Sequence, residues 1–477
     1  MQLYLETIRD LCRNLPLGPL DPGGRESARV TLEQVYVGLD SQSPVSVVFE
    51  RQKGETRSAL AHVAGLPCLV IKGDPGSGKS TFLRFLALRL AQARLEPEGD
   101  WLSYLAWPVY SRQEERRQLS PLAEKEEPLG FQPWSLPAYV PVLVTLRDFA
   151  ATNFDPASPL ALWEFIVADL NRRGLADTVE AVRAVLVKGE GLLLLDGVDE
   201  VPPARRAQVW QAIGALSQSI FNRCHWLATC RILSYVEEEA ATAAPNGVIT
   251  LAPLTQAQID AFIAAWYQAL VDLGEKTPAQ SDNLAAQLRR AAAGPLRELA
   301  PNPMLLTIMA LVQSYYGTLP DERAKLYQAC VETLLLRWQQ SKETVVGGLP
   351  VSLAELGLKQ EVIEPLLWEI GWMAHFEQTG RQEAADIPEV QVMALAKKHL
   401  GDYAKAEVFV EYTERRAHLL VGTGGREDRR FSFPHRTFQE YLAGCHLAND
   451  RRFGRKAISL AETGAPWREP CSWPPER

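Results

Sequence analysis

Gly73-Asp-Pro-Gly-Ser-Gly-Lys-Ser80 is the stretch that decides the fold. It fits the pattern G-x-x-x-x-G-K-[ST] of a phosphate-binding P-loop. The glycines let backbone N–H groups turn toward a phosphate, Lys79 would neutralise the β- and γ-phosphates of a nucleotide, and Ser80 would ligate Mg²⁺. The start of the following helix adds a partial positive charge. The expected nucleotide-binding residues are Gly73, Asp74, Pro75, Gly76, Ser77, Gly78, Lys79, Ser80 and Thr81.

The residues on either side of this loop have the secondary structure that a P-loop requires. The continuous apolar run 66–71 suits a central strand of a parallel sheet, buried on both faces. From residue 79 to 93 apolar residues recur at helical spacing. Further strands are expected at 140–146, 191–195 and 226–229, and helices at 161–170 and 179–187. This alternation predicts a doubly wound, mostly parallel α/β sheet.

Acidic residues end another apolar run, Leu192-Leu-Leu-Leu-Asp-Gly-Val-Asp-Glu200. Open α/β sheets bind ligands at the carboxyl ends of their strands. Asp196 is placed to hold Mg²⁺ through water, and Asp199 and Glu200 to polarise an attacking water or to tune the metal. The competing interpretation is an acidic turn at the start of a helix.

Arginines end two other predicted strands. Arg231, in Thr229-Cys-Arg231, could reach a γ-phosphate and stabilise developing charge. A strand-end salt bridge is the alternative for this residue. Arg147 follows the strand at 140–146, and we interpret it as structural.

Strand patterns mostly end at about residue 252, and helices dominate the rest of the chain. Thr255 and Gln258 have the spacing of a capping box. Asn302-Pro303 places a cap residue before a proline at the first helical position. Helices are expected at 304–312, 323–338, 361–376 and 436–447. The fold class is therefore α/β followed by a helical half.

Composition limits the classes of function. The chain has 477 residues and a formal net charge of −8, which argues against nucleic acid as the main partner, despite basic clusters at 426–430 and 451–456. No signal peptide or apolar run near the ~20 residues of a membrane span is visible. Seven cysteines without a CxxC pair suit a cytoplasmic protein. The group Cys224, His225 and Cys230 matches no zinc spacing and is interpreted as structural.

Six segments, taken in order, resemble the NACHT family of STAND P-loop ATPases, of the bacterial kind related to NLR immune receptors. The DGxDE form of the acidic strand end and the H-R-T-F-Q-E-Y stretch are the specific ones, whereas the P-loop alone is generic. Cys230 and Met304 replace the commoner residues. The matching segments are 73–80, 141–148, 193–202, 229–231, 302–306 and 433–442.

The resemblance adds two nucleotide contacts. It implies that Pro303 packs near the adenine. It also implies that His435, within a winged-helix motif, contacts the ADP β-phosphate in a closed state. From its position between aromatic side chains alone, His435 would be a core residue.

The resemblance also implies a division into domains. Members usually carry an effector domain before these segments and a repeat sensor after them; neither is expected here, and three prolines break the helical pattern in 470–477. The expected parts are a short helical segment at 1–60, a P-loop NTPase domain at 61–252 with an insertion at 95–138, a helical domain at 253–345, a winged-helix-like domain at 346–450, and a truncated tail at 451–477.

The function implied is an ATP/ADP-binding, Mg²⁺-dependent switch with slow hydrolysis, in bacterial immune or stress signalling. Self-association in the ATP-bound state is expected, with effector or sensor partners that the sequence does not identify. The catalytic residues would be Lys79, Asp199, Glu200 and Arg231, with Ser80 and Asp196 at the metal. Two alternatives stay open: a turnover ATPase of another class, and a nucleotide-binding scaffold without signalling output.

Overall fold

The computed structural model forms two compact units. Unit 1 comprises Met1–Pro16, Ala28–Ala285 and Leu299–Leu306, and unit 2 comprises Leu17–Ser27, Ala286–Glu298 and Thr307–Arg477. The residues that the structure describes are 1–13, 15, 30–42, 56–74, 76–109, 130–294, 296–316, 324–325, 327–329, 331–332, 344–346, 349–351, 358–377, 387–415, 419–423, 429–433 and 436–449.

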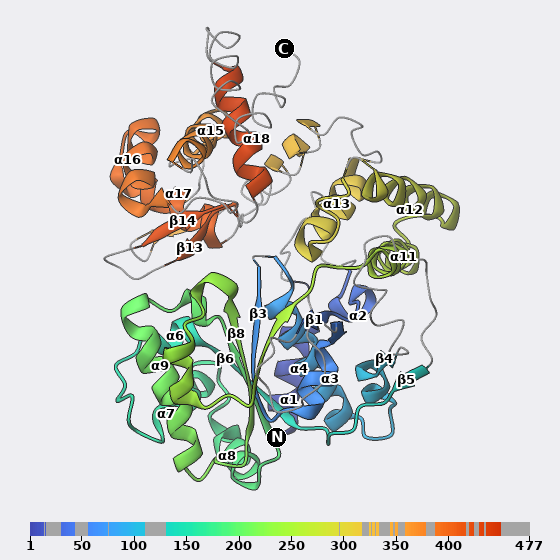
Figure 1. The fold of residues 1–477 in the computed structure, drawn as a ribbon, viewed down its shortest axis with the longest axis vertical. Helices are drawn as coiled ribbons and strands as arrows, with labels where there is room; N and C mark the ends of the chain where they lie inside the picture. The colour runs from blue at the N-terminus through green and yellow to red at the C-terminus, as the bar shows by residue number, and fades with distance from the viewer. Residues whose placement is uncertain are drawn as a thin grey trace. The chain divides into compact units, whose positions relative to one another are not determined.

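Unit 1 is built on a seven-stranded sheet in the order β2-β1-β9-β3-β8-β7-β6 (Figure 1). The five strands from β9 to β6 are parallel, and β1 pairs antiparallel with both β2 and β9. The predicted strands therefore form one doubly wound, mostly parallel layer. The strands are β1 (Asp40–Gln42), β2 (Thr56–Ser58), β3 (Cys68–Gly73), β6 (Val140–Thr145), β7 (Gly191–Asp196), β8 (His225–Arg231) and β9 (Gly247–Leu251).

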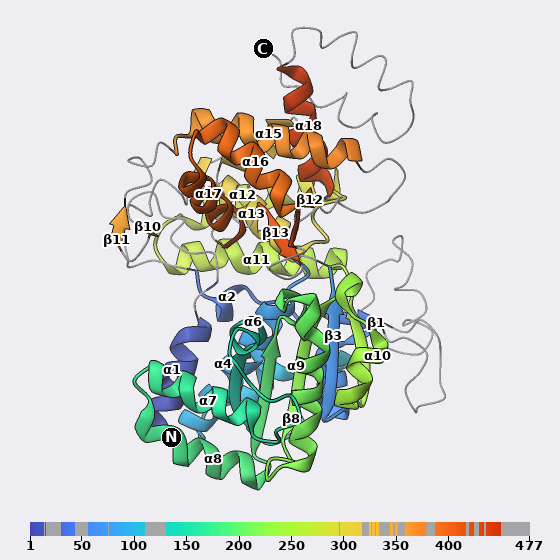
Figure 2. The ribbon, with the colours of Figure 1, turned by 90° about the vertical axis from the view of Figure 1, so that its left-hand side faces the viewer.

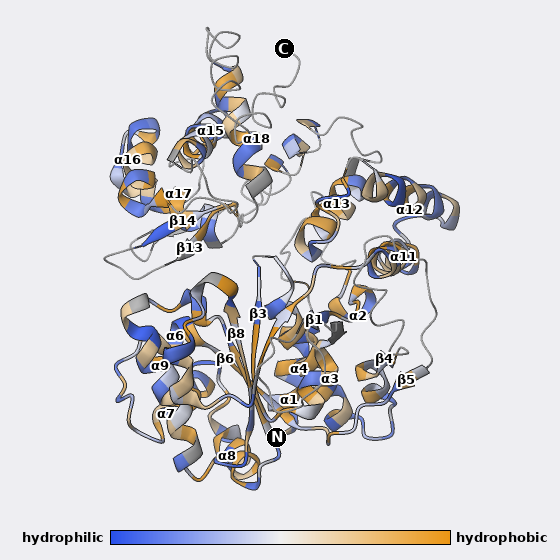
Figure 3. Cartoon of the chain, viewed as in Figure 1, coloured by the Kyte–Doolittle hydropathy of each residue, from blue (hydrophilic) through white to orange (hydrophobic). Residues whose placement is uncertain are grey.

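Burial on both faces explains the continuous apolar runs in the central strands. The side chains of residues 192–195 in β7 are at most 2% exposed. In Figure 3 the middle of the sheet is largely coloured hydrophobic. Parallel strands that are covered by helices on both sides show this composition.

Helices cover both faces of the sheet. In Figure 1, α1, α3 and α4 lie on one side and α7, α8 and α9 on the other, and Figure 2 turns the second group toward the viewer. The helices of this layer are α1 (Gln2–Arg13), α2 (Leu32–Val35), α3 (Ala59–Gly65), α4 (Lys79–Leu95), α6 (Leu146–Ala150), α7 (Ala161–Arg172), α8 (Val179–Lys188), α9 (Pro203–Ala215) and α10 (Glu237–Ala240).

The predicted helix after the P-loop is more deeply buried than its pattern suggests. Phe82, Leu86 and Leu90 in α4 are fully buried, as expected, but so is Leu88 on another side of the helix. Arg89 is also buried and lies 4.0 Å from the ring of Tyr104, which belongs to a short 3-10 helix at Trp101–Leu105. Segments outside the sheet thus enclose α4 and fix the helix that begins at Lys79.

Three strands of this sheet were not predicted from the sequence. Only helical structure was expected before residue 60, whereas β1 and β2 add an antiparallel edge to the sheet. No strand was expected at β9, which pairs in parallel with β3. Within the region expected as an insertion, β4 (Trp107–Val109) and β5 (Gly130–Gln132) form a separate antiparallel pair.

Three helices follow the sheet: α11 (Gln256–Asp272), α12 (Pro278–Ala293) and α13 (Pro303–Tyr316). The predicted capping box at the start of α11 is present, because Thr255 Oγ1 accepts from Gln258 N and the Gln258 side chain accepts from Thr255 N at 2.8 Å. The predicted cap of α13 is also present. Asn302 Oδ1 accepts from the backbone N–H groups of Met304 and Leu305, at 3.1 and 3.2 Å.

Unit 2 contains helices and a small antiparallel sheet in the order β12-β14-β13. Its central helix pair is α15 with α18, where Gly371 allows close approach: a Cβ at this position would lie 2.5 Å from Leu442 Cβ. These elements form the winged-helix domain. Their bounds are α15 (Gln360–Glu377), α16 (Glu389–Leu400), α17 (Tyr403–Arg415), α18 (Arg436–Ala448), β12 (Ile387–Pro388), β13 (Val421–Thr423) and β14 (Arg430–Ser432), with a separate pair β10 (Thr344–Val346) and β11 (Leu349–Val351).

None of the helices in the described part of the chain has the length and apolar character needed to cross a bilayer.

Candidate functional site

Two glycines give the P-loop a backbone conformation that most other residues would not adopt. Gly76 and Gly78 have φ of 76° and 91°, in the left-handed region that residues with a Cβ rarely adopt. The hydroxyl of Ser77 is buried and has no hydrogen-bond partner among the described residues. A buried hydroxyl without a partner is unusual, and a phosphate oxygen would satisfy it. Pro75 lies outside the described residues.

Lys79 extends back into the loop. Its Nζ donates to the backbone carbonyl oxygens of Gly73, at 2.8 Å, and Asp74, at 3.0 Å. Desolvation lowers the pKa of Lys79, and the nearby Asp199 carboxylate opposes this shift. The ammonium group is therefore held in a poorly hydrated position, where its attraction for an added anion is strong.

Ser80 and Asp196, the two residues predicted at the metal, are in contact. Ser80 Oγ donates to Asp196 Oδ1 at 2.9 Å. The same carboxylate oxygen accepts from Thr229 Oγ1 at 2.6 Å, and Thr229 Oγ1 accepts from Gly197 N at 2.8 Å. Thr229 thereby fixes the rotamer of Asp196 from the neighbouring strand.

This set of oxygens fits Mg²⁺. Magnesium prefers oxygen ligands and usually takes only one or two from protein side chains, with waters and phosphates completing the shell. Within the described residues no group of three or more His, Cys, Asp or Glu side chains gathers as a metal site. A hydroxyl and a carboxylate beside the P-loop are what a magnesium–nucleotide site of this kind requires.

Asp199 and Arg231 form a nearly buried ion pair. Arg231 Nε lies 2.8 Å from Asp199 Oδ2, and Arg231 N donates to Asp199 Oδ1 at 3.1 Å. The side chains are 8% and 15% exposed for Asp199 and Arg231 respectively. In this structure both Asp199 oxygens are occupied, and Arg231 makes the strand-end salt bridge that was the alternative to a phosphate contact.

Glu200 belongs to the same 3-10 turn, Val198–Glu200 (η3), but is more accessible. Its Oε2 lies 3.6 Å from Arg147 Nη1, and 46% of its side chain is exposed. Desolvation and the neighbouring Asp196 carboxylate raise the pKa of Glu200 to about 7, against the lowering effect of Arg147. Glu200 is therefore the better placed of the two acids to accept a proton near neutral pH.

The segment before α13 lies against the P-loop within unit 1. Met304 N donates to Gly76 O at 3.2 Å. A Cβ at Gly76 would lie 2.7 Å from Asn302 Oδ1, and Pro303 Cγ is 3.8 Å from the Cβ position of Gly78. Pro303 is thus beside the loop, as a nucleotide contact would require. His435 lies outside the described residues.

Sequence reasoning gave no separate role to Thr229 or Arg147. Thr229 stood only as part of a three-residue motif, and Arg147 was interpreted as structural. The signal for both was their place at the carboxyl ends of β8 and β6, the two neighbours of β7. In a parallel sheet those ends converge on the residues that follow β7.

The residues considered for zinc, and Arg429 of those considered for nucleic acid, have other contacts, whereas 426–428 and 451–456 lie outside the described residues. The Cys224 thiol donates to Leu186 O, the His225 ring packs on Tyr139, and Cys230 is fully buried. Arg429 forms ion pairs with Glu389 and Glu414.

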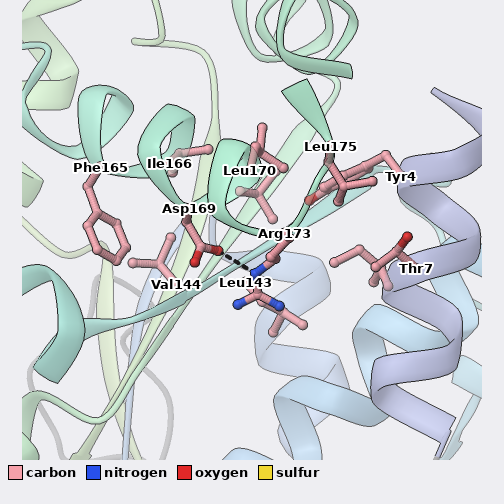
Figure 4. Close-up of a pocket in the computed structure, with 12 residues that line it drawn as sticks. Tyr4, Thr7, Leu143, Val144, Phe165, Ile166, Asp169, Leu170, Arg173 and Leu175 are labelled. Atoms are coloured by element: carbon pink, nitrogen blue, oxygen red, sulfur yellow. Dashed lines mark hydrogen bonds and ion pairs between the residues drawn. The ribbon is translucent and has the colours of Figure 1, made fainter. Parts of the chain in front are cut away.

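A small cavity lies elsewhere in unit 1, among α1, β6 and α7 (Figure 4). Its volume of 20 Å³ is enough for about one water molecule. Tyr4 Oη donates to Pro141 O at its edge, and Asp169 pairs with Arg173. Its size excludes a nucleotide.

Comparison with known proteins gives one family match. Residues 323–447 match the model of the winged helix-turn-helix domain C-terminal to NACHT. No match was found among curated proteins.

Two solved structures are also similar to the chain. The Orc1 protein of Aeropyrum pernix in complex with DNA is 14% identical and has a TM-score of 0.30; the alignment covers 80% of this chain and 91% of that one. Cdc6p of Pyrobaculum aerophilum is 12% identical with a TM-score of 0.27, over 78% and 86% of the two chains. These scores are too low to bear on fold or function.

The matched winged helix lies in the part of the chain that follows the P-loop sheet. Its family model is specific to domains that follow NACHT. In unit 1 the expected acidic strand end and strand-end arginine occupy neighbouring strands beside that loop. Residues 323–447 are therefore similar to the winged-helix domain that follows NACHT, and in this chain they come after a P-loop sheet.

Proposed function

We propose that unit 1 binds ATP and ADP with Mg²⁺ and that the bound nucleotide sets the signalling state of the protein. The observation that carries this proposal is the continuous contact from Ser80 through Asp196 to Thr229, directly beside a P-loop whose lysine is already turned inward. Ser80 and Asp196 supply oxygen ligands of the kind that Mg²⁺ prefers. Nucleotide with Mg²⁺ would supply the phosphoanhydride bond and the charge that the site is built to neutralise.

Different residues of the chain would then bind the phosphates, the metal and the adenine. The backbone of Gly76–Lys79 and the Ser77 hydroxyl bind phosphate oxygens, and Lys79 neutralises their charge. Ser80 and Asp196 hold the metal, with Thr229 keeping Asp196 in place. Pro303 borders the loop on the side where the resemblance places the adenine.

Hydrolysis in this proposal depends on Glu200. It accepts a proton from water, because it is the more exposed acid of η3 and titrates near neutral pH. Asp199 instead holds Arg231, so the arginine reaches a phosphate only when that ion pair opens. Opening a nearly buried ion pair is costly, which is consistent with slow hydrolysis and a switch rather than rapid turnover.

The resemblance supplies the rest of the switch. His435 would contact ADP and favour a closed state, and ATP would favour an open, self-associating state. For His435 this proposal depends on the motif alone. A difference in contact between the two nucleotides is the kind of bias that a ligand-driven change of state requires. The setting would be cytoplasmic bacterial immune or stress signalling, with unidentified effector or sensor partners.

The direct test is to denature the purified protein and identify any released nucleotide by chromatography, which also distinguishes adenine from guanine. The measurement is repeated after incubation with nucleotide and Mg²⁺. We expect ADP or ATP from the wild type, strong loss in Lys79→Ala, and normal retention in Lys188→Ala, a control on the exposed side of α8. A wild-type protein that carries and binds no nucleotide would defeat the proposal.

Steady-state rate separates the switch from the turnover ATPase. A rate well above ~1 s⁻¹, within the usual range of enzymes, contradicts the switch. The scaffold alternative predicts nucleotide binding without any change in association state between ADP and ATP. Light scattering with each nucleotide distinguishes that alternative.

A further inference from the structure

Two consecutive arginines near the start of α9 donate hydrogen bonds to the backbone carbonyls of two different segments. Arg206 is only 9% exposed. Its Nε donates to Val201 O at 3.0 Å and its Nη2 donates to Asp199 O at 3.1 Å. Among the described residues no carboxylate pairs with Arg206, so its guanidinium is used on the carbonyls of the acidic turn.

Arg205 makes the corresponding contacts with the end of α6. Its Nη1 donates to Thr152 O at 2.9 Å and also to Ala150 O. The guanidinium lies 4.8 Å from the ring centre of Phe154. Arg205 therefore fixes the chain just after the helix that carries Arg147.

The two segments that these arginines bind, η3 and the end of α6, each contribute one residue to an ion pair. Arg147 lies on α6 and Glu200 on η3, 3.6 Å apart. Two backbone hydrogen bonds close the turn, Glu200 N to Gly197 O and Val201 N to Val198 O, both 3.1 Å long. Without Arg206 the carbonyls of Asp199 and Val201 would lose their charged donor, and such bonds are among the stronger ones in proteins.

A planar guanidinium is suited to this task. It presents several donors in a rigid fork and can bind two carbonyls at once, which a lysine ammonium on a flexible stem does less well. If burial alone were needed at this position, an apolar side chain would serve without the cost of desolvating a charge. The geometry thus favours a positioning role over simple packing.

We propose that Arg205 and Arg206 form a clamp that aligns Glu200 with Arg147 and keeps Asp199 in register with Arg231. The clamp consists of positioning residues that act through η3 and the end of α6. The effect of the clamp on hydrolysis rests on the function proposed above. Its effect on the stability of the η3 backbone does not.

The first test is amide hydrogen exchange of the full chain without nucleotide. In Arg206→Met, peptides that span 197–202 should exchange about tenfold faster than in the wild type, since the turn loses two charge-assisted bonds. Peptides from β3 and the first turns of α4 should be unchanged. Arg206→Lys should give an intermediate increase, because one carbonyl can keep its donor.

The second test separates binding from hydrolysis. With nucleotide and Mg²⁺, Arg206→Met should lower kcat about tenfold, while the Kd of a fluorescent ADP analogue stays within about twofold of the wild type. Arg183→Met, on the exposed surface of α8, is the matched control and should change neither quantity. Should Arg206→Met fail to fold, Arg205→Met is the second variant, with faster exchange confined to residues 149–154.

Three results would overturn the clamp. Exchange at 197–202 could stay at the wild-type rate in Arg206→Met. It could instead rise equally over all of unit 1, which would show a general loss of stability. Finally, kcat and nucleotide affinity could fall by the same factor. If the wild type binds no nucleotide, the proposed function fails, and the exchange pattern alone then decides whether the clamp exists.

Discussion

At the scale of single residues, the two acids of η3 have different surroundings and should have different roles. Glu200→Gln removes the accessible carboxylate while keeping its shape, so we expect hydrolysis to fall by at least about a hundredfold. Nucleotide affinity should be retained, because Lys79 and Ser80 are untouched. Single-turnover hydrolysis and ADP titration measure the two quantities. Glu180→Gln, on α8, is the control and should behave like the wild type; equal loss in both variants would contradict the role of Glu200.

The pH dependence of hydrolysis follows from the same residue. A base with a pKa of about 7 is ionised only above that pH, so the rate should rise about tenfold per pH unit below it and level off above. Arg147 lowers this pKa, and its removal therefore raises it. In Arg147→Gln the rising limb should move to higher pH. Profiles measured from pH 5.5 to 9 test this, and an unmoved limb would show that Arg147 does not act on Glu200.

Site residues could be proposed from the sequence where a motif is local, whereas contacts between residues far apart in the chain could not. The P-loop residues are contiguous in the sequence, so their chemistry can be inferred from the motif. Asp199 and Arg231 are 32 positions apart, and their pairing depends on the adjacency of β7 and β8. No spacing rule in one sequence gives that adjacency. Asp199 was therefore assigned to the attacking water or the metal, and Arg231 to the γ-phosphate with a strand-end salt bridge as the alternative.

At the scale of elements, two helix caps offer a matched pair of variants. Asn302→Ala and Thr255→Ala should each destabilise the protein by about 1 kcal/mol, the usual cost of losing a cap. Only Asn302 lies against Gly76 of the P-loop. We therefore expect weaker ADP binding in Asn302→Ala and unchanged binding in Thr255→Ala, measured at equal fractions folded. Equal affinities in the two variants would contradict a role for this segment at the nucleotide.

The elements also differ in how well the hydrophobic pattern of the sequence predicts them. β3, β6 and β7 each contain a continuous apolar run because both faces are covered, and these runs were visible in the sequence. β9 alternates buried and half-buried residues over only five positions, and β1 is a short polar Asp-Ser-Gln strand between β2 and β9. Short strands of this kind are fixed by pairing with a neighbour, not by their own composition.

At the scale of the whole molecule, the winged helix could not be derived from periodicity. Helical spacing predicted α15 and α18 but gave no reason for them to pack on each other. That packing depends on the absence of a side chain at Gly371, opposite Leu442. The resemblance in residues 433–442 supplied the domain, and the family match over residues 323–447 supports it.

Because the chain has two compact units, calorimetry can measure which of them a bound nucleotide stabilises. If ADP with Mg²⁺ binds unit 1 alone, only one thermal transition should rise, by roughly 5–10 °C at a hundredfold excess over Kd. If His435 also contacts ADP, the transition of unit 2 should rise as well, and His435→Ala should abolish only that second shift. His399→Ala removes a hydrogen bond with Glu369 inside unit 2, so it should lower that transition without changing its response to ADP. A second shift that survives in His435→Ala would remove His435 from the switch, because a residue that contributes no binding energy cannot bias a ligand-driven equilibrium.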